Sequence, residues 1–183
     1  IPIIYGLDAV YGHNNVVGAT IFLHNNGLGC STNPDSVAEI GRVTALEVAA
    51  TGIHWTFAPC LAVALDYRWG RTYESFGESV ELVSNLSAPA VQGIQGKTLN
   101  LSHGILACAK HFVGDGGTQW GTGKTGMLDR GDTRITENEL RRIHLPGYLE
   151  AIKAGVGSIM ASFNKWNGDY CHGNKYLLTN LLK

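Results

Sequence analysis

The stretch ILACAKHFVGDGGT, residues 105–118, carries the two features from which the fold can be inferred. Its first residues are small or apolar, as a strand buried in a parallel sheet requires. Lys110 and His111 then leave this apolar run together and enter a glycine-rich segment. Because burying a lysine without a partner is costly, the basic pair predicts a polar site where the strand ends.

Similar apolar runs alternate with helical patterns on both sides of this stretch. We expect buried strands at residues 1–5, 53–59, 105–112 and 156–163, and a further apolar run at 19–23. We expect helices at residues 33–52, at 78–96 with Pro89 disturbing the middle, at 136–155, and beginning at 174. Strands separated by helices of this length indicate βαβ units and a parallel sheet, so the fold class is α/β.

Two of these helices have clear boundary signals. Asn33 can cap the first helix, Pro34 suits its first position, and Gly52 suits its end. Thr136 and Glu139 form a capping box, TENE, at the start of a later helix.

Polar residues concentrate at or just beyond the ends of the predicted strands: Asp8, Arg71, Lys110, His111, Ser162 and Asn164. In a (β/α)8 barrel, active sites are built at the carboxyl-terminal rim. We therefore expect a partial (β/α)8 TIM-like barrel, with parallel strands alternating with helices and a polar site at that rim.

The motif GLDAVYGHN, residues 6–14, places Asp8 directly after a predicted strand. A carboxylate has two oxygens in a fixed plane, so Asp8 can accept hydrogen bonds from two neighbouring sugar hydroxyls. The alternative is a loop aspartate that caps its own backbone.

The motif DYRWGRTYES, residues 66–75, combines arginines, acids and aromatic rings. Arg71 offers a rigid fork of hydrogen-bond donors. The rings offer faces on which a sugar or a guanidinium can stack: Tyr67, Trp69 and Tyr73. The alternative is a structural cluster in which Arg68 or Arg71 pairs with Asp66 or Glu74.

Lys110 and His111 can serve one site only where the strand is irregular, because neighbours in a regular strand point to opposite faces. The glycines that follow permit a sharp departure from the strand. We therefore expect both side chains in one pocket with Asp8 and Arg71. The alternative has His111 hydrogen-bonded inside the barrel and Lys110 reaching solvent.

Composition and motif searches argue against several classes of function. A formal net charge of −1 gives no footprint for nucleic acid or an anionic membrane, and no apolar stretch approaches the roughly 20 residues of a membrane span. The seven histidines form no HxH or HExxH pattern, so we expect no metal site. The four cysteines form no CxxC pattern, and Cys60 and Cys108 are expected to be buried free thiols.

In order and spacing, these motifs resemble glycoside hydrolase family 3 over nearly the whole chain, and most of all its β-glucosidase and β-glucan exohydrolase branch. The resemblance implies a first-domain barrel in which Asp8, Arg71, Lys110 and His111 bind the hydroxyls of a terminal sugar, without a cofactor. Possible pocket neighbours are Glu74, Asp115, Met160, Ser162 and Phe163. A tyrosine frequent in this branch is replaced here by Phe163.

The family's two catalytic carboxylates, a nucleophile and an acid/base, are expected beyond Lys183, so we assign no catalytic residue within the chain. We expect residues 1–183 to be a single fragment of the N-terminal catalytic barrel that lacks its first and last strands. The expected partner is the second domain of the parent protein.

The resemblance implies that the parent is a retaining, exo-acting β-glucosidase or β-glucan glucohydrolase. It would release terminal glucose from β-linked glucosides or oligosaccharides. Two alternatives stay open: another activity of the same family, such as β-xylosidase or N-acetylglucosaminidase, and a non-catalytic carbohydrate-binding protein. A secreted, periplasmic or cell-wall location is expected from the resemblance.

Overall fold

The computed structural model describes residues 3–99 and 104–183. Its main layer consists of short parallel strands in chain order: β1 (Gly6–Leu7), β2 (Trp55–Thr56), β3 (Cys108–Phe112) and β5 (Ser158–Ala161). β1 pairs with β2, and β3 pairs with β5. Two single bridges, Trp55 to Leu106 and Cys60 to Lys110, join the two pairs in parallel.

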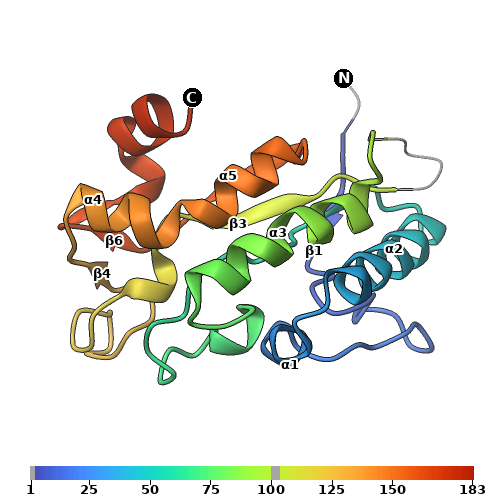
Figure 1. The fold of residues 1–183 in the computed structure, drawn as a ribbon, viewed down its shortest axis with the longest axis horizontal. Coiled ribbons are helices and arrows are strands. Elements are labelled where there is room, and N and C mark those ends of the chain that lie inside the picture. Colours follow the sequence, from blue (N-terminus) through green and yellow to red (C-terminus); the bar gives the residue numbers. More distant parts are fainter. Residues whose placement is uncertain (1–2, 100–103) are drawn as a thin grey trace.

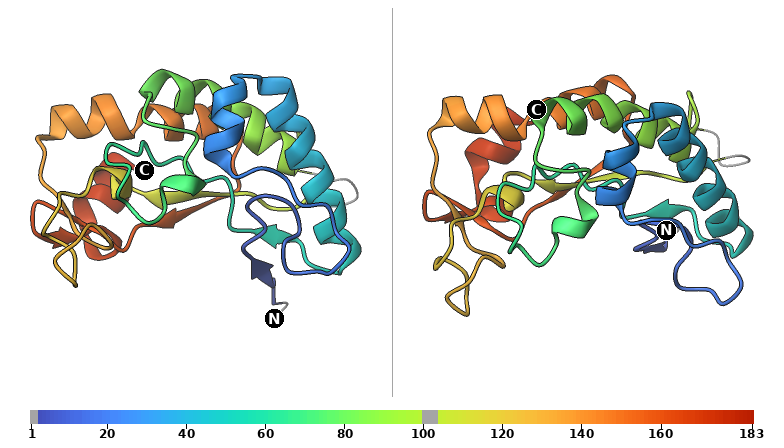
Figure 2. Two further views of the ribbon diagram at one scale, coloured as in Figure 1. Left: turned by 90° about the horizontal axis from the view of Figure 1, so that it is seen from below. Right: turned by 60° about the horizontal axis from the view of Figure 1, so that its bottom comes forward.

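Helices cover one face of this layer. The bounds of the long helices are α2 (Pro34–Ala50), α3 (Val80–Gln95) and α5 (Pro146–Lys153). They lie side by side, with α3 packed between α2 and α5 (Figure 1). Two further views place the strands beneath these helices (Figure 2). The arrangement is that of part of a (β/α)8 barrel, and the α/β prediction is confirmed.

Smaller elements surround this framework. A separate three-stranded sheet contains β4 (Asp132–Thr133), β6 (Lys165–Trp166) and β7 (Asp169–Tyr170), in the order β4-β6-β7. The short helices are α1 (Asn25–Ser31) and α4 (Glu137–Glu139). Further helical turns span Thr72–Glu74, Asp115–Gly117, Leu140–His144, Cys171–Gly173 and Tyr176–Leu181.

The predicted boundaries of α2 are confirmed. The Asn33 side chain accepts hydrogen bonds from the backbone N–H groups of Asp35 and Ser36, at 3.0 and 3.3 Å. Pro34 occupies the first turn, and Gly52 follows the helix with φ +80°. The cap satisfies N–H groups that have no partner within the helix.

The predicted disturbance at Pro89 is wrong, because α3 runs through this proline without a break. Proline removes one hydrogen bond from a helix. The loss is offset by burial of one face of α3 against α2 and α5. The packing is close at Gly93, where an added Cβ would lie 2.2 Å from the carbonyl oxygen of Ala38.

The helix predicted for residues 136–155 is not uniform. Its capping box is confirmed, since Thr136 accepts from the Glu139 backbone and Glu139 accepts from the Thr136 backbone. The chain then widens into a π-helical segment, Leu140–His144, before α5 starts at Pro146. Proline cannot donate to the preceding turn and its ring crowds the carbonyl four residues earlier, which accounts for the local change.

The strand predictions at 1–5 and 53–59 were too generous, and the apolar run 19–23 does not form a strand. Residues 1–2 lie outside the described residues, and the side chains of Ile3, Ile4 and Tyr5 are exposed because β1 starts only at Gly6. The apolar run 19–23 forms a single bridge, and the run 53–59 forms only the two residues of β2. Apolar composition shows what can be buried, but not whether a partner strand covers it.

The hydrophobic core lies between the strands and the helices. Phe112 of β3 packs edge-to-face on Tyr148 of α5, with ring centroids 5.1 Å apart. Cys60 and Cys108 are buried free thiols, as predicted, and burial raises the pKa of Cys60 to about 12. Within the described ranges, no helix is both long and apolar enough to cross a bilayer.

Candidate functional site

A cavity of about 440 Å³ opens where β1, β3 and β5 end. It is lined by residues that the sequence singled out: Asp8, Arg71, Lys110, His111, Asp115, Met160, Ser162 and Phe163. Glu74, the remaining predicted neighbour, lies behind Arg71 and Lys110 and does not line the cavity. The structure therefore brings together side chains that are more than 150 positions apart in the sequence.

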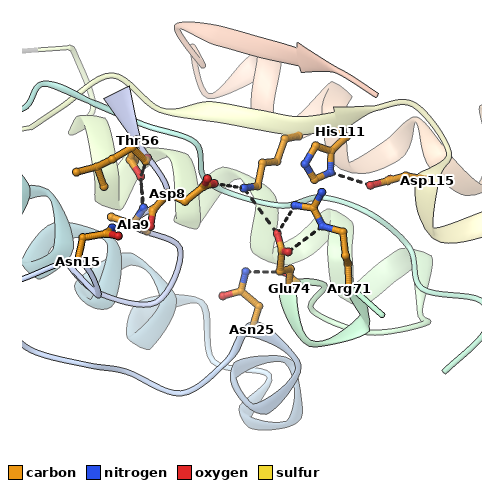
Figure 3. A network of polar contacts seen from close by, with 11 residues as sticks. Asp8, Ala9, Asn15, Asn25, Thr56, Arg71, Glu74, His111 and Asp115 are labelled. Atoms are coloured by element: carbon orange, nitrogen blue, oxygen red, sulfur yellow. Dashed lines mark hydrogen bonds and ion pairs between the residues drawn. The ribbon is translucent and has the colours of Figure 1, made fainter. Parts of the chain in front are cut away.

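Lys110 lies at the centre of the site. Its Nζ donates a hydrogen bond to Asp8 Oδ1 at 2.7 Å and lies 3.6 Å from Glu74 Oε2. The loop that carries Asp8 is held against β2, because the Ala9 backbone N–H donates to Thr56 Oγ1 (Figure 3). The carboxylate of Asp8 thus serves a neighbouring cation, rather than acting as a cap for its own loop.

Arg71 and Glu74 form a bidentate ion pair. Glu74 ends the helical turn Thr72–Glu74, and Arg71 directly precedes this turn. Arg71 Nε and Nη2 donate to the two carboxylate oxygens of Glu74, both at 2.8 Å (Figure 3). Burial disfavours the charged form of Glu74, but the hydrogen bonds from Arg71 and the charge of Lys110 outweigh it, so its pKa lies below the ordinary value. Arg71 is both a structural partner of Glu74 and a wall of the cavity.

The second arginine of this motif has a different place. Arg68 pairs with Asp66 at 2.6 Å, and its guanidinium lies 4.3 Å from the centre of the Trp120 ring. The structural alternative therefore holds for Arg68, which does not line the cavity.

An irregularity in β3 brings Lys110 and His111 to the same cavity. Lys110 is level with Met160 of β5, whereas Phe112 is level with Ala161, so His111 is the additional residue of a bulge. The Lys110–His111 and Phe112–Val113 peptide bonds are cis. Bulges re-aim side chains beside active sites. Both side chains lie in one pocket with Asp8 and Arg71, while their contact with a sugar remains a prediction.

His111 has a buried acidic partner. Its Nδ1 lies 2.8 Å from Asp115 Oδ2 (Figure 3). Asp115 belongs to the turn Asp115–Gly117, directly after β3. Behind the turn, burial lowers the pKa of His144 to about 4, although Asp115 opposes the shift.

The rim of the cavity contains residues that the sequence did not indicate. Asp129 and Arg130 come from the long glycine-rich loop, and the Arg130 guanidinium lies 5.6 Å from the ring centre of Phe163. His172 stacks on Phe163 with ring centroids 4.6 Å apart. No motif or spacing distinguishes Asp129 and Arg130 from other charged loop residues, so no sequence signal pointed to them.

The site combines features that suit a neutral, hydroxyl-rich ligand. Arg71 and Lys110 donate, Asp8 accepts, and charge-assisted hydrogen bonds of this kind are the stronger class. Trp69 and Phe163 add apolar walls. In the part of the chain that the structure describes, no group of three or more His, Cys, Asp or Glu side chains is arranged to hold a metal ion.

Comparison with known proteins identifies the class to which this fold and site belong. The family model described as "Glycosyl hydrolase family 3 N terminal domain" matches residues 1–183. The chain therefore belongs to glycosyl hydrolase family 3, and the resemblance inferred from its motifs is confirmed. The partial TIM-like barrel is the fold of this domain.

Three relatives show how far the likeness extends. The crystal structure of an exo-1,3/1,4-β-glucanase from a Pseudoalteromonas species matches the whole chain with a TM-score of 0.93 and 53% identity. That of a β-glucosidase from Listeria innocua in complex with glucose matches the whole chain with a TM-score of 0.88 and 35% identity. A lysosomal β-glucosidase from Dictyostelium discoideum is 38% identical over the whole chain. The chain covers 23%, 24% and 22% of these three proteins, respectively.

Proposed function

We propose that the full-length protein containing this chain is an exo-acting β-glucosidase or β-glucan glucohydrolase. In this proposal, residues 1–183 supply the pocket for the terminal glucose. The catalytic carboxylates and the second domain come from sequence outside this chain.

The single observation that carries the proposal is the cluster of Asp8, Arg71 and Lys110 at one cavity. Its donors and acceptors suit the hydroxyls of a pyranose ring, each of which can both donate and accept. The identity to an exo-1,3/1,4-β-glucanase and to a β-glucosidase that binds glucose supports glucose over other sugars.

The proposed reaction is retaining hydrolysis. One carboxylate attacks the anomeric carbon and forms a glycosyl-enzyme intermediate, while a carboxylic acid roughly 5 Å away protonates the leaving oxygen and later activates water. Hydrogen bonds from the pocket residues to ring hydroxyls strengthen as the ring distorts, so they raise the rate as well as the affinity.

The test uses the full-length protein with 4-nitrophenyl β-glucoside, laminaribiose and cellobiose. We expect release of glucose from the non-reducing end, with the β-anomer as the first product by proton NMR. Release of xylose from 4-nitrophenyl β-xyloside, or of N-acetylglucosamine from its aryl glycoside, at a higher kcat/KM would assign another activity of the family. Binding of glucose without any turnover would favour the carbohydrate-binding alternative.

We also propose a non-cytoplasmic location: secreted, periplasmic or in the cell wall. The relative from Dictyostelium discoideum, which is named a lysosomal β-glucosidase, supports a location outside the cytoplasm. Fractionation of the source cells, with activity measured in each fraction, tests the proposal.

A further inference from the structure

The glycine-rich turn after β3 packs closely against the segment that contains Val63 and against His144. Gly114 adopts φ +88°, a left-handed conformation that favours glycine. A Cβ on Gly116 would lie 2.3 Å from the carbonyl oxygen of Val63, and one on Gly117 would lie 2.5 Å from His144 Nε2. Glycine at these positions lets the turn pack tightly, which returns Asp115 to the end of β3.

This turn is fixed by hydrogen bonds on two sides. Thr133 Oγ1 donates to the Gly114 carbonyl at 2.6 Å, and the Leu65 backbone N–H donates to the Gly116 carbonyl at 2.9 Å. Asp115 therefore sits on a backbone that is held in place independently of its own side chain. Its carboxylate is aimed at His111 by that backbone.

The contact between Asp115 and His111 is buried and short. Both residues are 7% exposed, and Asp115 Oδ2 lies 2.8 Å from His111 Nδ1. Among residues 3–99 and 104–183, Asp115 Oδ1 has no hydrogen-bond partner, so the histidine is the main contact of this carboxylate.

The chemistry of the pair determines the state of the imidazole. An ionised carboxylate can only accept, so the proton of the shared hydrogen bond belongs to Nδ1. Nε2 is then the ring nitrogen left to face the cavity that His111 lines. The hydrogen bond made by one ring nitrogen sets the role of the other.

From this geometry we propose that Asp115 is a positioning residue that fixes the orientation and the Nδ1–H tautomer of His111, so that Nε2 meets a hydroxyl of the terminal sugar. The inference rests on the proposed function and deepens it. It assigns a role in sugar recognition to the VGDGGT motif, exerted through the contact of Asp115 with His111 in β3.

The test is a double-mutant cycle in the full-length protein with Asp115→Asn, His111→Ala and the double variant. Asp115→Asn keeps the shape but removes the charge that orients Nδ1–H. We expect a fall of about 10- to 100-fold in kcat/KM for 4-nitrophenyl β-glucoside, the scale of one lost charge-assisted hydrogen bond. In the His111→Ala background, the same change should cost less than about twofold, because its partner is already absent.

Asp132→Asn is the matched control. Asp132 is a buried carboxylate that accepts from Gly168 N and Arg134 Nε, and it does not line the cavity. Any loss of kcat/KM caused by Asp132→Asn should be the same in the wild-type and His111→Ala backgrounds. Asp115→Ala, which removes the acceptor altogether, repeats the cycle with a second variant.

Equal losses from Asp115→Asn in the two backgrounds would overturn the inference and make Asp115 a residue that only shapes its turn. Glucose affinity, measured by calorimetry on the same four proteins, gives a readout that does not need turnover. If the wild-type protein binds glucose but does not hydrolyse glucosides, the proposed function fails while the cycle in glucose affinity still decides the role of Asp115. If it does not bind glucose either, both are wrong.

Discussion

Lys110 Nζ lies 2.7 Å from Asp8 Oδ1, although 102 positions separate the two residues in the sequence. Their exposure is very unequal: 2% of the lysine side chain and 63% of the aspartate side chain are accessible. The ammonium is thus desolvated and depends on its acidic neighbours, while much of the Asp8 carboxylate remains open. Asp8 can hold Lys110 with one oxygen and accept from a sugar with the other.

Asp8→Ala should severely reduce activity in the full-length protein. Removing the carboxylate deletes the proposed sugar contact and leaves Lys110, among the described residues, with the more distant Glu74 as its acidic partner. We expect a loss on the order of 3 kcal/mol, which is about a hundredfold in kcat/KM. Steady-state kinetics check this, with Asp35→Ala on the exposed start of α2 as the control. Near-normal kinetics of Asp8→Ala would make Asp8 a structural residue of its loop.

Glu74→Gln should lower stability in a pH-dependent way. Glu74 is 6% exposed and neutralises Arg71 and Lys110, so the neutral amide weakens two ion pairs. We expect a loss of about 2 kcal/mol in the free energy of unfolding at neutral pH, less than for a fully buried pair because Arg71 is partly solvated. Denaturant unfolding of the full-length protein measures it.

The sign of the pH dependence follows from the lowered pKa of Glu74. A carboxylate whose pKa is lower in the folded state than in the unfolded state stabilises the fold at pH values above its unfolded-state pKa, about 4.3. This stabilisation is lost as the pH falls through the pKa of the folded state. The difference in the free energy of unfolding between wild type and Glu74→Gln should therefore be constant from about pH 6 to 8 and shrink below about pH 4.5. A difference that widens on acidification would contradict this assignment.

The centre of the site could be predicted from the sequence because its residues lie near the carboxyl ends of apolar strands. Asp8, Lys110 and His111 lie next to short apolar runs, and parallel strands carry their ends to one rim. The rim itself could not be predicted. Arg130 reaches the cavity through the path of a long loop, and nothing in its neighbours fixes that path.

Errors in the fold predictions have a common physical origin. Pro89 breaks an isolated helix but is tolerated in one packed between two others. Ile3 and Ile4 are apolar, yet no described strand covers them. Local composition determined caps and turns correctly, whereas these cases depend on tertiary contacts.

Gly93→Ala should destabilise the packing of α2 against α3. The new Cβ would lie 2.2 Å from the carbonyl oxygen of Ala38, and backbone on both sides leaves no flexible group to move. We expect a loss of about 1–3 kcal/mol, although alanine favours helix more than glycine does. Gly27→Ala in α1 is the control, because its nearest contact is a side-chain atom at 3.5 Å. Equal melting temperatures for the two variants would contradict the close contact.

Phe163→Ala should weaken substrate binding more than it slows turnover. Phe163 is 60% exposed at the cavity mouth, with His172 stacked on its ring and Arg130 nearby. Removing the ring takes away an apolar wall, and an aromatic contact of this kind is worth about 1 kcal/mol, or about fivefold in KM. Tyr170→Ala is the matched control, because this ring contacts Phe163 but does not line the cavity. If both variants raised KM equally for 4-nitrophenyl β-glucoside, the effect would come from the aromatic cluster and not from contact with the sugar.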